Sequence, residues 1–343
     1  QDASNKLGMT APETMLMAQH LYEGIDVEGL GHVAFVTYIR TDSTRVSSDA
    51  QAAARQYIEA NYGKEYLPAK PNFYASKKGA QDAHEAIRPI DLARTPESVK
   101  KLLDRKHYSV YKLIYERFIA SQMTEALYDA MQIEIANGDY TLKASGRALR
   151  FAGYTVVWQE SKPAGAGEEE ETKGLLPPLA EGDPLACLSV KPEQKFTKPP
   201  VRYTDASLVK TMEDKGIGRP STYATIISVL NKRKYVEKEG KYMKPTEVAY
   251  RITDLLVKYF PDVMDVGFTA DMESKLDEIE DGGKDWHSVI AAFYPPFAEK
   301  LRFAKTDGDE LTDVKCPKCG HPMVRKNGKY GTYLACSNYP ACS

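Results

Sequence analysis

The sequence predicts an α+β protein built from several domains, and three observations support this prediction. The chain has 343 residues, more than one compact core usually holds, so two to four domains are expected. Apolar residues have helical spacing toward both ends, whereas from about residue 127 apolar and polar residues alternate as in strands. Four of the five cysteines lie between residues 316 and 342, which indicates a metal site in a reducing compartment.

Charge and hydropathy exclude some classes of protein. The 46 basic and 48 acidic residues give a net charge of −2, so any surface that binds nucleic acid must be local. No apolar run approaches the roughly 18 to 20 residues of a membrane span, and no signal peptide opens the chain. We therefore expect a cytoplasmic protein that does not enter a membrane.

Residues 10–13, Thr-Ala-Pro-Glu, form a capping box that predicts a helix ending at Gly24. The apolar run 33–36 then predicts a buried strand. Tyr38 and Arg40 would lie at the end of this strand with their side chains on one face. A second helix is predicted for residues 48–62.

The stretch 36–47 between these elements combines a phenol, two guanidiniums, a carboxylate and several hydroxyls. Arg40 could hold a phosphate through two parallel donors, and Tyr38 could attack it if cations, a base or a metal assisted loss of the phenol proton. The hydroxyls and Asp42 precede a helix N-terminus, where N–H groups and the helix dipole favour an anion. The alternative is a half-buried packing tyrosine beside an arginine in a surface ion pair.

His84 and Arg88 are four residues apart, so on a helix they would share a face and could grip one phosphate. A solvated histidine and arginine are the alternative. Residues 96–120 predict a helix whose aromatic stripe is most simply core.

The middle of the chain has a strand pattern. Residues 131–144 alternate on either side of Asn137-Gly138 and predict a hairpin. Further strands are predicted at residues 154–158 and 185–190, with Cys187 buried in the second. The intervening acidic segment predicts a solvated loop.

After residue 199 the pattern returns to helices. Thr204 or Asp205 caps a helix that runs to about residue 215, and a glycine turn leads to a second helix over residues 220–233. A hairpin about Glu239-Gly240 follows, and this order is typical of winged DNA-binding domains, although such a helix pair is also common as scaffold. Phosphate contacts are predicted for Arg219, Ser221, Thr222 and Arg233.

The C-terminal cysteines have the spacing of a zinc ribbon, whose first pair is a Cys-x2-Cys knuckle. Four thiolates with no other ligand predict a closed, structural Zn²⁺ site rather than a catalytic one. The ligands would be Cys316, Cys319, Cys336 and Cys342.

Five stretches in chain order resemble type IA DNA topoisomerases, and bacterial topoisomerase I most of all; they are residues 1–24, 36–47, 83–89, 216–224 and 268–273. The resemblance implies that Tyr38 takes one DNA strand as a 5′-phosphotyrosyl ester to relax negative supercoils. Arg40 would hold the phosphate, with Asp42 and His84 shaping the site. Single-strand contacts are implied for Arg88, Arg219, Ser221, Thr222 and Arg233.

The resemblance also implies four domains. Residues 1–124 would form the catalytic-tyrosine domain and 125–198 a β-rich arch with a flexible acidic loop at 159–184. Residues 199–309 would form a helical, winged-helix-like DNA-binding domain, and 310–343 the zinc ribbon.

In this family a Toprim-type domain binds Mg²⁺, and residues 1–343 contain no counterpart of its acidic ligands. Because position 1 is not Met, we expect an N-terminally truncated piece that relaxes no DNA by itself. It would be a monomer acting on single-stranded or negatively supercoiled DNA in the bacterial nucleoid.

Two other interpretations remain open. The chain could be a topoisomerase III-like decatenase, although the zinc ribbon favours topoisomerase I. It could also be a noncatalytic winged-helix and zinc-ribbon DNA-binding protein in which Tyr38 only packs. Complexes of such a binder dissociate in high salt, whereas the enzyme leaves DNA attached after denaturation.

Overall fold

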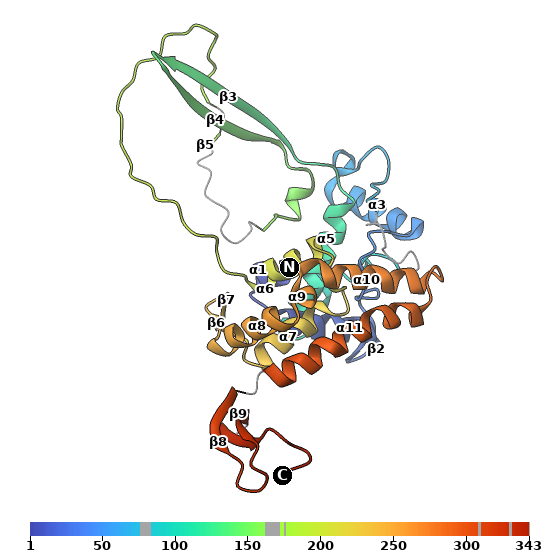
Figure 1. The fold of residues 1–343 in the computed structure, drawn as a ribbon. Coiled ribbons are helices and arrows are strands. Elements are labelled where there is room, and N and C mark those ends of the chain that lie inside the picture. The colour runs from blue at the N-terminus through green and yellow to red at the C-terminus, as the bar shows by residue number, and fades with distance from the viewer. Residues whose placement is uncertain (76–83, 162–171, 175, 308–309, 329–330, 343) are drawn as a thin grey trace. The chain divides into compact units, whose positions relative to one another are not determined.

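The computed structural model describes residues 1–75, 84–161, 172–174, 176–307, 310–328 and 331–342. They belong to two compact units, one formed by Gln1–Glu213 and Arg219–Lys244, the other by Asp214–Gly218 and Pro245–Ser343. Helices and small antiparallel sheets occur in both units (Figure 1), which confirms the predicted α+β class. The four-domain division stays a prediction.

The first unit contains seven helices and seven strands within the described residues. The helices are α1 Asp2–Leu7, α2 Ala11–Glu23, α3 Ser48–Tyr62, α4 Pro96–Val99, α5 Arg105–Ser121, α6 Asp205–Asp214 and α7 Tyr223–Lys232. The strands are β1 Ile25–Val27, β2 Gly31–Val33, β3 Leu127–Asn137, β4 Tyr140–Phe151, β5 Thr172–Lys173, β6 Val236–Glu239 and β7 Tyr242–Pro245.

The helices of this unit begin at residues whose side chains accept backbone N–H groups. Thr10 accepts from Glu13 N in the predicted capping box of α2. Ser47 accepts from Ala50 N at the start of α3. The helix predicted over residues 48–62 is thereby confirmed as α3, with the extended backbone of Ser47 preceding it.

One apolar core lies between α2, α3 and α5. Its fully buried side chains include Leu21, Phe35, Ile58 and Tyr111. The rings of Phe35 and Tyr111 meet edge to face with centroids 5.5 Å apart. The aromatic stripe predicted from residue 96 onward therefore lies in the core, although that segment forms two helices, α4 and α5, rather than one.

Strands β3 and β4 form a long antiparallel hairpin (Figure 1) whose turn is Gly138-Asp139, since Asn137 pairs with Tyr140. The predicted hairpin is thus confirmed. The short strand β5 pairs with β4 in parallel. The strand predicted at residues 154–158 is wrong, because Gly153 at φ +49° turns the chain into a 3-10 helix, Gly153–Val156.

The strand predicted at residues 185–190 is also wrong. These residues have no regular secondary structure, and Leu188 is 95% exposed. Cys187 is exposed rather than buried. Alternating apolar residues need a neighbouring strand to form a ladder, and none of the described strands pairs with this segment.

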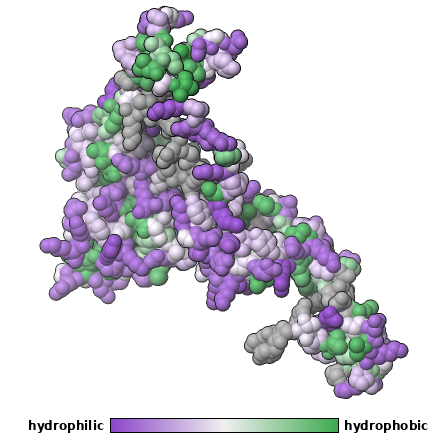
Figure 2. Space-filling view, turned by 90° about the vertical axis from the view of Figure 1, so that its left-hand side faces the viewer, coloured by the Kyte–Doolittle hydropathy of each residue, from purple (hydrophilic) through white to green (hydrophobic). Residues whose placement is uncertain are grey.

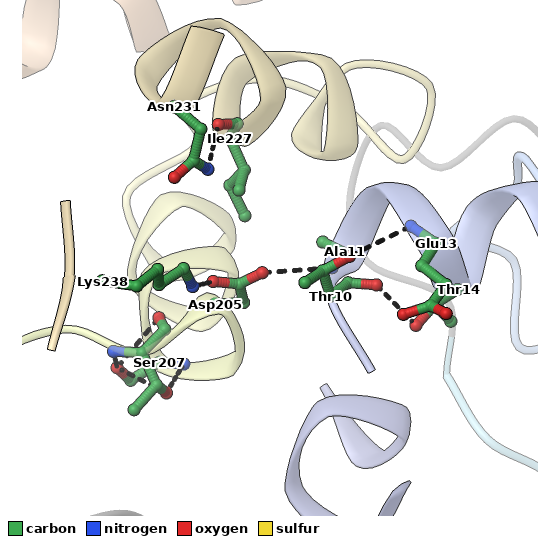
Figure 3. A network of polar contacts seen from close by, with 10 residues as sticks. Thr10, Ala11, Glu13, Thr14, Asp205, Ser207, Ile227, Asn231 and Lys238 are labelled. Carbon is green, nitrogen blue, oxygen red and sulfur yellow. Dashed lines mark hydrogen bonds and ion pairs between the residues drawn. The ribbon is translucent and has the colours of Figure 1, made fainter. Parts of the chain in front are cut away.

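Helices α6 and α7 and the hairpin β6–β7 form the predicted winged arrangement. The Thr204 hydroxyl accepts from Ser207 N at 3.1 Å and caps α6. Asp205 has another role: its buried carboxylate pairs with Lys238 of β6 and accepts from Ala11 N of α2 at 3.2 Å (Figure 3). Asp205 thus connects three elements of the first unit.

The second unit contains four helices and a three-stranded sheet within the described residues. These are α8 Glu247–Tyr259, α9 Pro261–Met264, α10 Val266–Glu280, α11 Trp286–Asp307, β8 Glu310–Lys315, β9 Pro322–Gly328 and β10 Gly331–Cys336. The sheet is antiparallel in the order β10-β9-β8.

On the face drawn in Figure 2, hydrophilic side chains predominate and hydrophobic ones form separate patches. None of the described helices combines the length and apolar character needed to cross a bilayer.

Candidate active site and metal centre

Tyr38 lies in an irregular segment that follows β2. The predicted strand over residues 33–36 ends at Val33, and Val36 makes only an isolated bridge with Pro89. The segment is held instead by backbone bonds to two neighbours: Phe35 N donates to Leu21 O at 2.8 Å, and Ile90 N donates to Phe35 O at 3.0 Å. These bonds fix the backbone on the N-terminal side of Tyr38 between the end of α2 and residues 88–90.

The Tyr38 ring contacts two other rings. The Tyr22 ring of α2 meets it edge to face, with centroids 5.4 Å apart and planes at 73°. The His84 ring is 4.8 Å away at 38°. Tyr38 is only partly buried. Its neighbours therefore limit rotation of the ring while part of the side chain remains open to solvent.

Arg40 is exposed, and its Nη2 donates to Gln19 Oε1 at 3.5 Å. No carboxylate of the described residues forms a salt bridge with it, so its charge is not neutralised there. Gln19 and Tyr22 are three residues apart on one face of α2. Because Gln19 contacts Arg40 and Tyr22 contacts Tyr38, both predicted catalytic side chains face the same side of α2.

His84 and Arg88 are not on a helix, so the helix inferred from their spacing is wrong. Residues 84–90 run as an irregular segment bonded to the Tyr38 segment, because Thr37 Oγ1 donates to Ala86 O at 2.9 Å and accepts from Arg88 N at 2.9 Å. These bonds bring His84 to Tyr38.

The Arg88 guanidinium is occupied within its own segment. Its Nε pairs with Glu85 Oε2 at 2.9 Å and its Nη1 donates to Pro89 O at 3.1 Å, and the side chain is only 15% exposed. A DNA contact by Arg88 stays a prediction. In this structure the residue stabilises the turn that carries His84.

The hydroxyls of residues 41–47 occupy the N–H groups that were expected to bind an anion. Thr41 Oγ1 accepts from Ser43 N at 3.0 Å, and Ser43 Oγ accepts from Arg45 N at 3.2 Å. The Asp42 carboxylate forms no hydrogen bond or ion pair with the described residues. This side chain is therefore available to a ligand, whereas much of the local backbone is not.

The predicted DNA contacts of the winged arrangement lie at opposite ends of α7. This helix begins at Tyr223 rather than near residue 220. Arg219, Ser221 and Thr222 form the preceding turn, in which Thr222 Oγ1 accepts from Arg219 N at 2.8 Å. Arg233 is exposed beyond the other end, about 15 Å away along a helix of this length. One phosphate cannot contact both groups.

The four predicted zinc ligands come together at one end of the β8–β10 sheet. Their sulfur atoms all lie within 4.8 Å of one another, and Cys316 Sγ and Cys342 Sγ are 3.8 Å apart. Tetrahedral Zn–S bonds of about 2.3 Å require sulfur atoms about 3.8 Å apart, so this arrangement fits zinc. Backbone N–H groups of Lys318 and Cys319 lower the pKa of the Cys316 thiol, whereas contacts among the thiols raise the pKa of Cys336 and Cys342. Zn²⁺ would hold all four as thiolates.

Comparisons with known proteins identify the family. A family model described as DNA topoisomerase matches residues 1–291. The chain belongs to this family, in its type IA branch. A second model, described as topoisomerase DNA binding C4 zinc finger, matches residues 313–343. The chain is also similar to the full-length topoisomerase I structure from Thermotoga maritima, with 40% identity and a TM-score of 0.76.

The similarity to the Thermotoga structure covers 98% of this chain and 54% of that one, so the chain spans about half the length of its relative. The type IA relationship and the resemblance to bacterial topoisomerase I are thereby confirmed. The four cysteines form a zinc ribbon of this topoisomerase type.

Sequence reasoning did not identify three residues of the site. Gln19 and Tyr22 of the helix predicted to end at Gly24 were not considered for the site, and the bonds of the Thr37 hydroxyl were not anticipated. The spacing of Gln19 and Tyr22, three residues apart, places both on one face of α2 and was the available signal. Their contacts with Arg40 and Tyr38 depend on how the segments pack.

Proposed function

We propose that Tyr38 is the nucleophile with which this type IA topoisomerase cuts and reseals one strand of DNA, thereby relaxing negative supercoils. The observation that supports this proposal is the arrangement around Tyr38. Its ring is positioned by Tyr22 and His84, and Arg40 lies on the same side of α2 with a charge that no described carboxylate neutralises. The packing alternative places Arg40 in a surface ion pair, and no described carboxylate forms one with it.

In the reaction, Tyr38 Oη attacks the phosphorus of a phosphodiester, and the bond from phosphorus to the 3′ oxygen breaks. The phenol proton is lost, the 3′ oxygen gains a proton, and the 5′ phosphate stays on the tyrosine. Arg40 neutralises the charge that develops on the phosphate oxygens. Attack of the 3′ hydroxyl on the phosphotyrosine reverses each of these changes and reseals the strand.

His84 and Asp42 serve as supporting groups in this proposal. His84 contacts the Tyr38 ring, and the Asp42 carboxylate has no partner among the described residues, so it can orient a ligand or accept a proton. Arg88, Arg219, Ser221, Thr222 and Arg233 would contact the single strand. Mg²⁺ would be held by a Toprim-type domain, as in the family, and would help neutralise the phosphate.

We further propose that the enzyme acts as a monomer in the bacterial cytoplasm, at the nucleoid. The match to the DNA-binding zinc-finger family and the similarity to a bacterial topoisomerase I support DNA as the partner. The structural zinc would stabilise the ribbon and would have no part in the chemistry.

The test is to incubate the chain with a Toprim-type domain of the same family, Mg²⁺ and 3′-labelled single-stranded DNA, and then to denature the sample. A 3′ label reports the downstream fragment, which a 5′-phosphotyrosyl bond retains. We expect labelled protein that disappears in Tyr38→Phe and persists in Tyr22→Phe, which keeps the ring contact. If the Toprim domain associates but no adduct forms, the chain is a DNA-binding protein in which Tyr38 only packs.

A further inference from the structure

A cavity of about 410 Å³ lies on the C-terminal side of the Tyr38 segment. Its walls come from residues that follow Tyr38, from the segment that carries Ala86, from α5, and from residues near the 3-10 helix at Gly153–Val156, with Tyr74 as a further lining residue. The lining residues used below are Ser43, Tyr74, Ala86, Arg117, Trp158 and Glu160. All of them belong to the first unit.

The cavity is close to Tyr38. His84 packs its ring on Tyr38 with centroids 4.8 Å apart, and Ala86, only two residues later, lines the cavity. Consecutive Cα atoms are 3.8 Å apart, so Ala86 lies within about 8 Å of His84. Ala86 N also donates to Arg45 O at 2.8 Å, which joins the two walls. A nucleotide that neighbours the phosphate at Tyr38 can therefore reach the cavity.

The charges of the cavity favour a neutral ligand. Arg117 Nη1 pairs with Glu160 Oε1 at 2.8 Å, and the guanidinium also lies over the Trp158 ring, 5.0 Å from its centroid. Arg117 is thus paired with a carboxylate, and Lys6 Nζ lies 3.2 Å from the centroid of the same Trp158 ring. A phosphate at Arg117 would have to displace Glu160, whereas an uncharged ring leaves the pair intact; because the Arg117 and Glu160 side chains are 53% and 57% exposed, this preference is small.

The lining offers both aromatic and polar contacts. Tyr74 is 50% exposed and lines the cavity, and its phenol donates to Ser121 O at 2.6 Å, so its position is fixed and its ring can offer an aromatic surface for stacking. The buried Ser43 hydroxyl also lines the cavity. Trp158 Nε1 is the single buried side-chain nitrogen or oxygen without a partner among the described residues, which indicates that this region is completed by a ligand or water.

We propose that this cavity binds one base of the single-stranded DNA whose phosphate reaches Tyr38. Its volume suits a single base with its sugar. The proposal rests on the proposed function, because that function brings the strand to Tyr38. A base held at a constant offset from the cut makes the cavity a determinant of cleavage preference.

Binding can be measured separately from cleavage. The chain has two tryptophans, so in Trp286→Phe the fluorescence reports Trp158 alone. Oligothymidylate of twelve nucleotides is titrated into this protein without Mg²⁺, beside a strand of the same length that carries only abasic residues. We expect quenching by the first strand and none by the second, because the second has the phosphates but no bases.

Substitutions of Tyr74 test whether its ring stacks on the base. Loss of one base-stacking ring costs roughly 1 to 3 kcal/mol, so Tyr74→Ala should weaken oligothymidylate binding about 5-fold to 150-fold, whereas Tyr74→Phe keeps the ring and should bind nearly as well as the parent. Phe73→Ala is the matched control: Phe73 is 83% exposed and lines a second cavity that Tyr74 also borders, but it does not line the cavity proposed here. The affinity of the Phe73→Ala protein for oligothymidylate should not change.

The proposal is overturned if the abasic strand quenches Trp158 equally, or if Tyr74→Ala and Phe73→Ala have the same effect. Tyr38→Phe separates this proposal from the function. Base-dependent quenching that survives in Tyr38→Phe supports the cavity even if no covalent adduct is ever found. An adduct formed with parental site preference by Tyr74→Ala would overturn the cavity while leaving Tyr38 as the nucleophile.

Discussion

Replacing Asp205 tests whether the winged arrangement and the tyrosine segment form one stable part of the protein. The Asp205 carboxylate is 3% exposed, pairs with Lys238 of β6, and accepts from Ala11 N in the first turn of α2 (Figure 3). Helix α2 also carries Gln19 and Tyr22, which contact Arg40 and Tyr38. Loss of this carboxylate should therefore loosen both regions.

The expected loss of stability follows from burial. Breaking a buried ion pair by removing one partner costs about 3 to 5 kcal/mol. The Lys238 side chain is 33% exposed and can regain water, so Asp205→Ala should lie at the lower end, about 3 kcal/mol. Asp205→Asn keeps an acceptor for Ala11 N and loses only the charge, so about 1 to 2 kcal/mol is expected.

The assay is unfolding in urea, monitored by Trp158 fluorescence in the Trp286→Phe background. Trp158 lies in the first unit, so its fluorescence reports the unfolding of that unit. Glu239→Gln is the control, because Glu239 pairs with Lys244 at 4.0 Å and is 66% exposed; it should change the free energy of unfolding by less than about 0.5 kcal/mol. If Asp205→Ala costs no more than Glu239→Gln, the carboxylate does not stabilise this part of the protein and the reasoning is refuted.

Four other outcomes are expected. Thr37→Val removes the hydroxyl that bonds residues 86 and 88, so stability should fall by roughly 1 to 2 kcal/mol in the urea assay and the covalent adduct should form more slowly; normal adduct formation would show that Thr37 does not hold His84 at Tyr38. Cys319→Ser should abolish zinc binding, measured by metal analysis, and unfold β8–β10 while the urea midpoint of the first unit stays constant. Burial raises the pKa of Tyr111 and Tyr115, so unfolding releases their protons above about pH 10 and stability should decline from there upward; between pH 9 and 11 Tyr111→Phe should lose less stability than the parent. Arg233→Ala should weaken single-strand binding and reduce the slope of log affinity against log salt by about 1, whereas an unchanged slope would exclude a phosphate contact at this position.

Local patterns in the sequence predicted the elements that local forces specify. The Thr10 capping box, the turn of the hairpin near Asn137 and the Cys316–Cys319 knuckle each depend on residues within a few positions of one another. The strand predicted at residues 185–190 depended on a partner strand, which its pattern cannot supply, and it did not form among the described residues. Periodicity alone therefore predicted helices and hairpins better than single strands.

The sequence by itself determined the family, the zinc ligands and the candidate nucleophile, because each is carried by short motifs whose residue types and spacing are visible in the chain. Only the tertiary structure decided which residues surround that nucleophile. Tyr22, Tyr38 and His84 come from three separate segments, and backbone bonds between residues 35–37 and 88–90 bring them together. Such bonds join backbone N–H and C=O groups, which every residue except proline has, so no pattern of side chains predicts them.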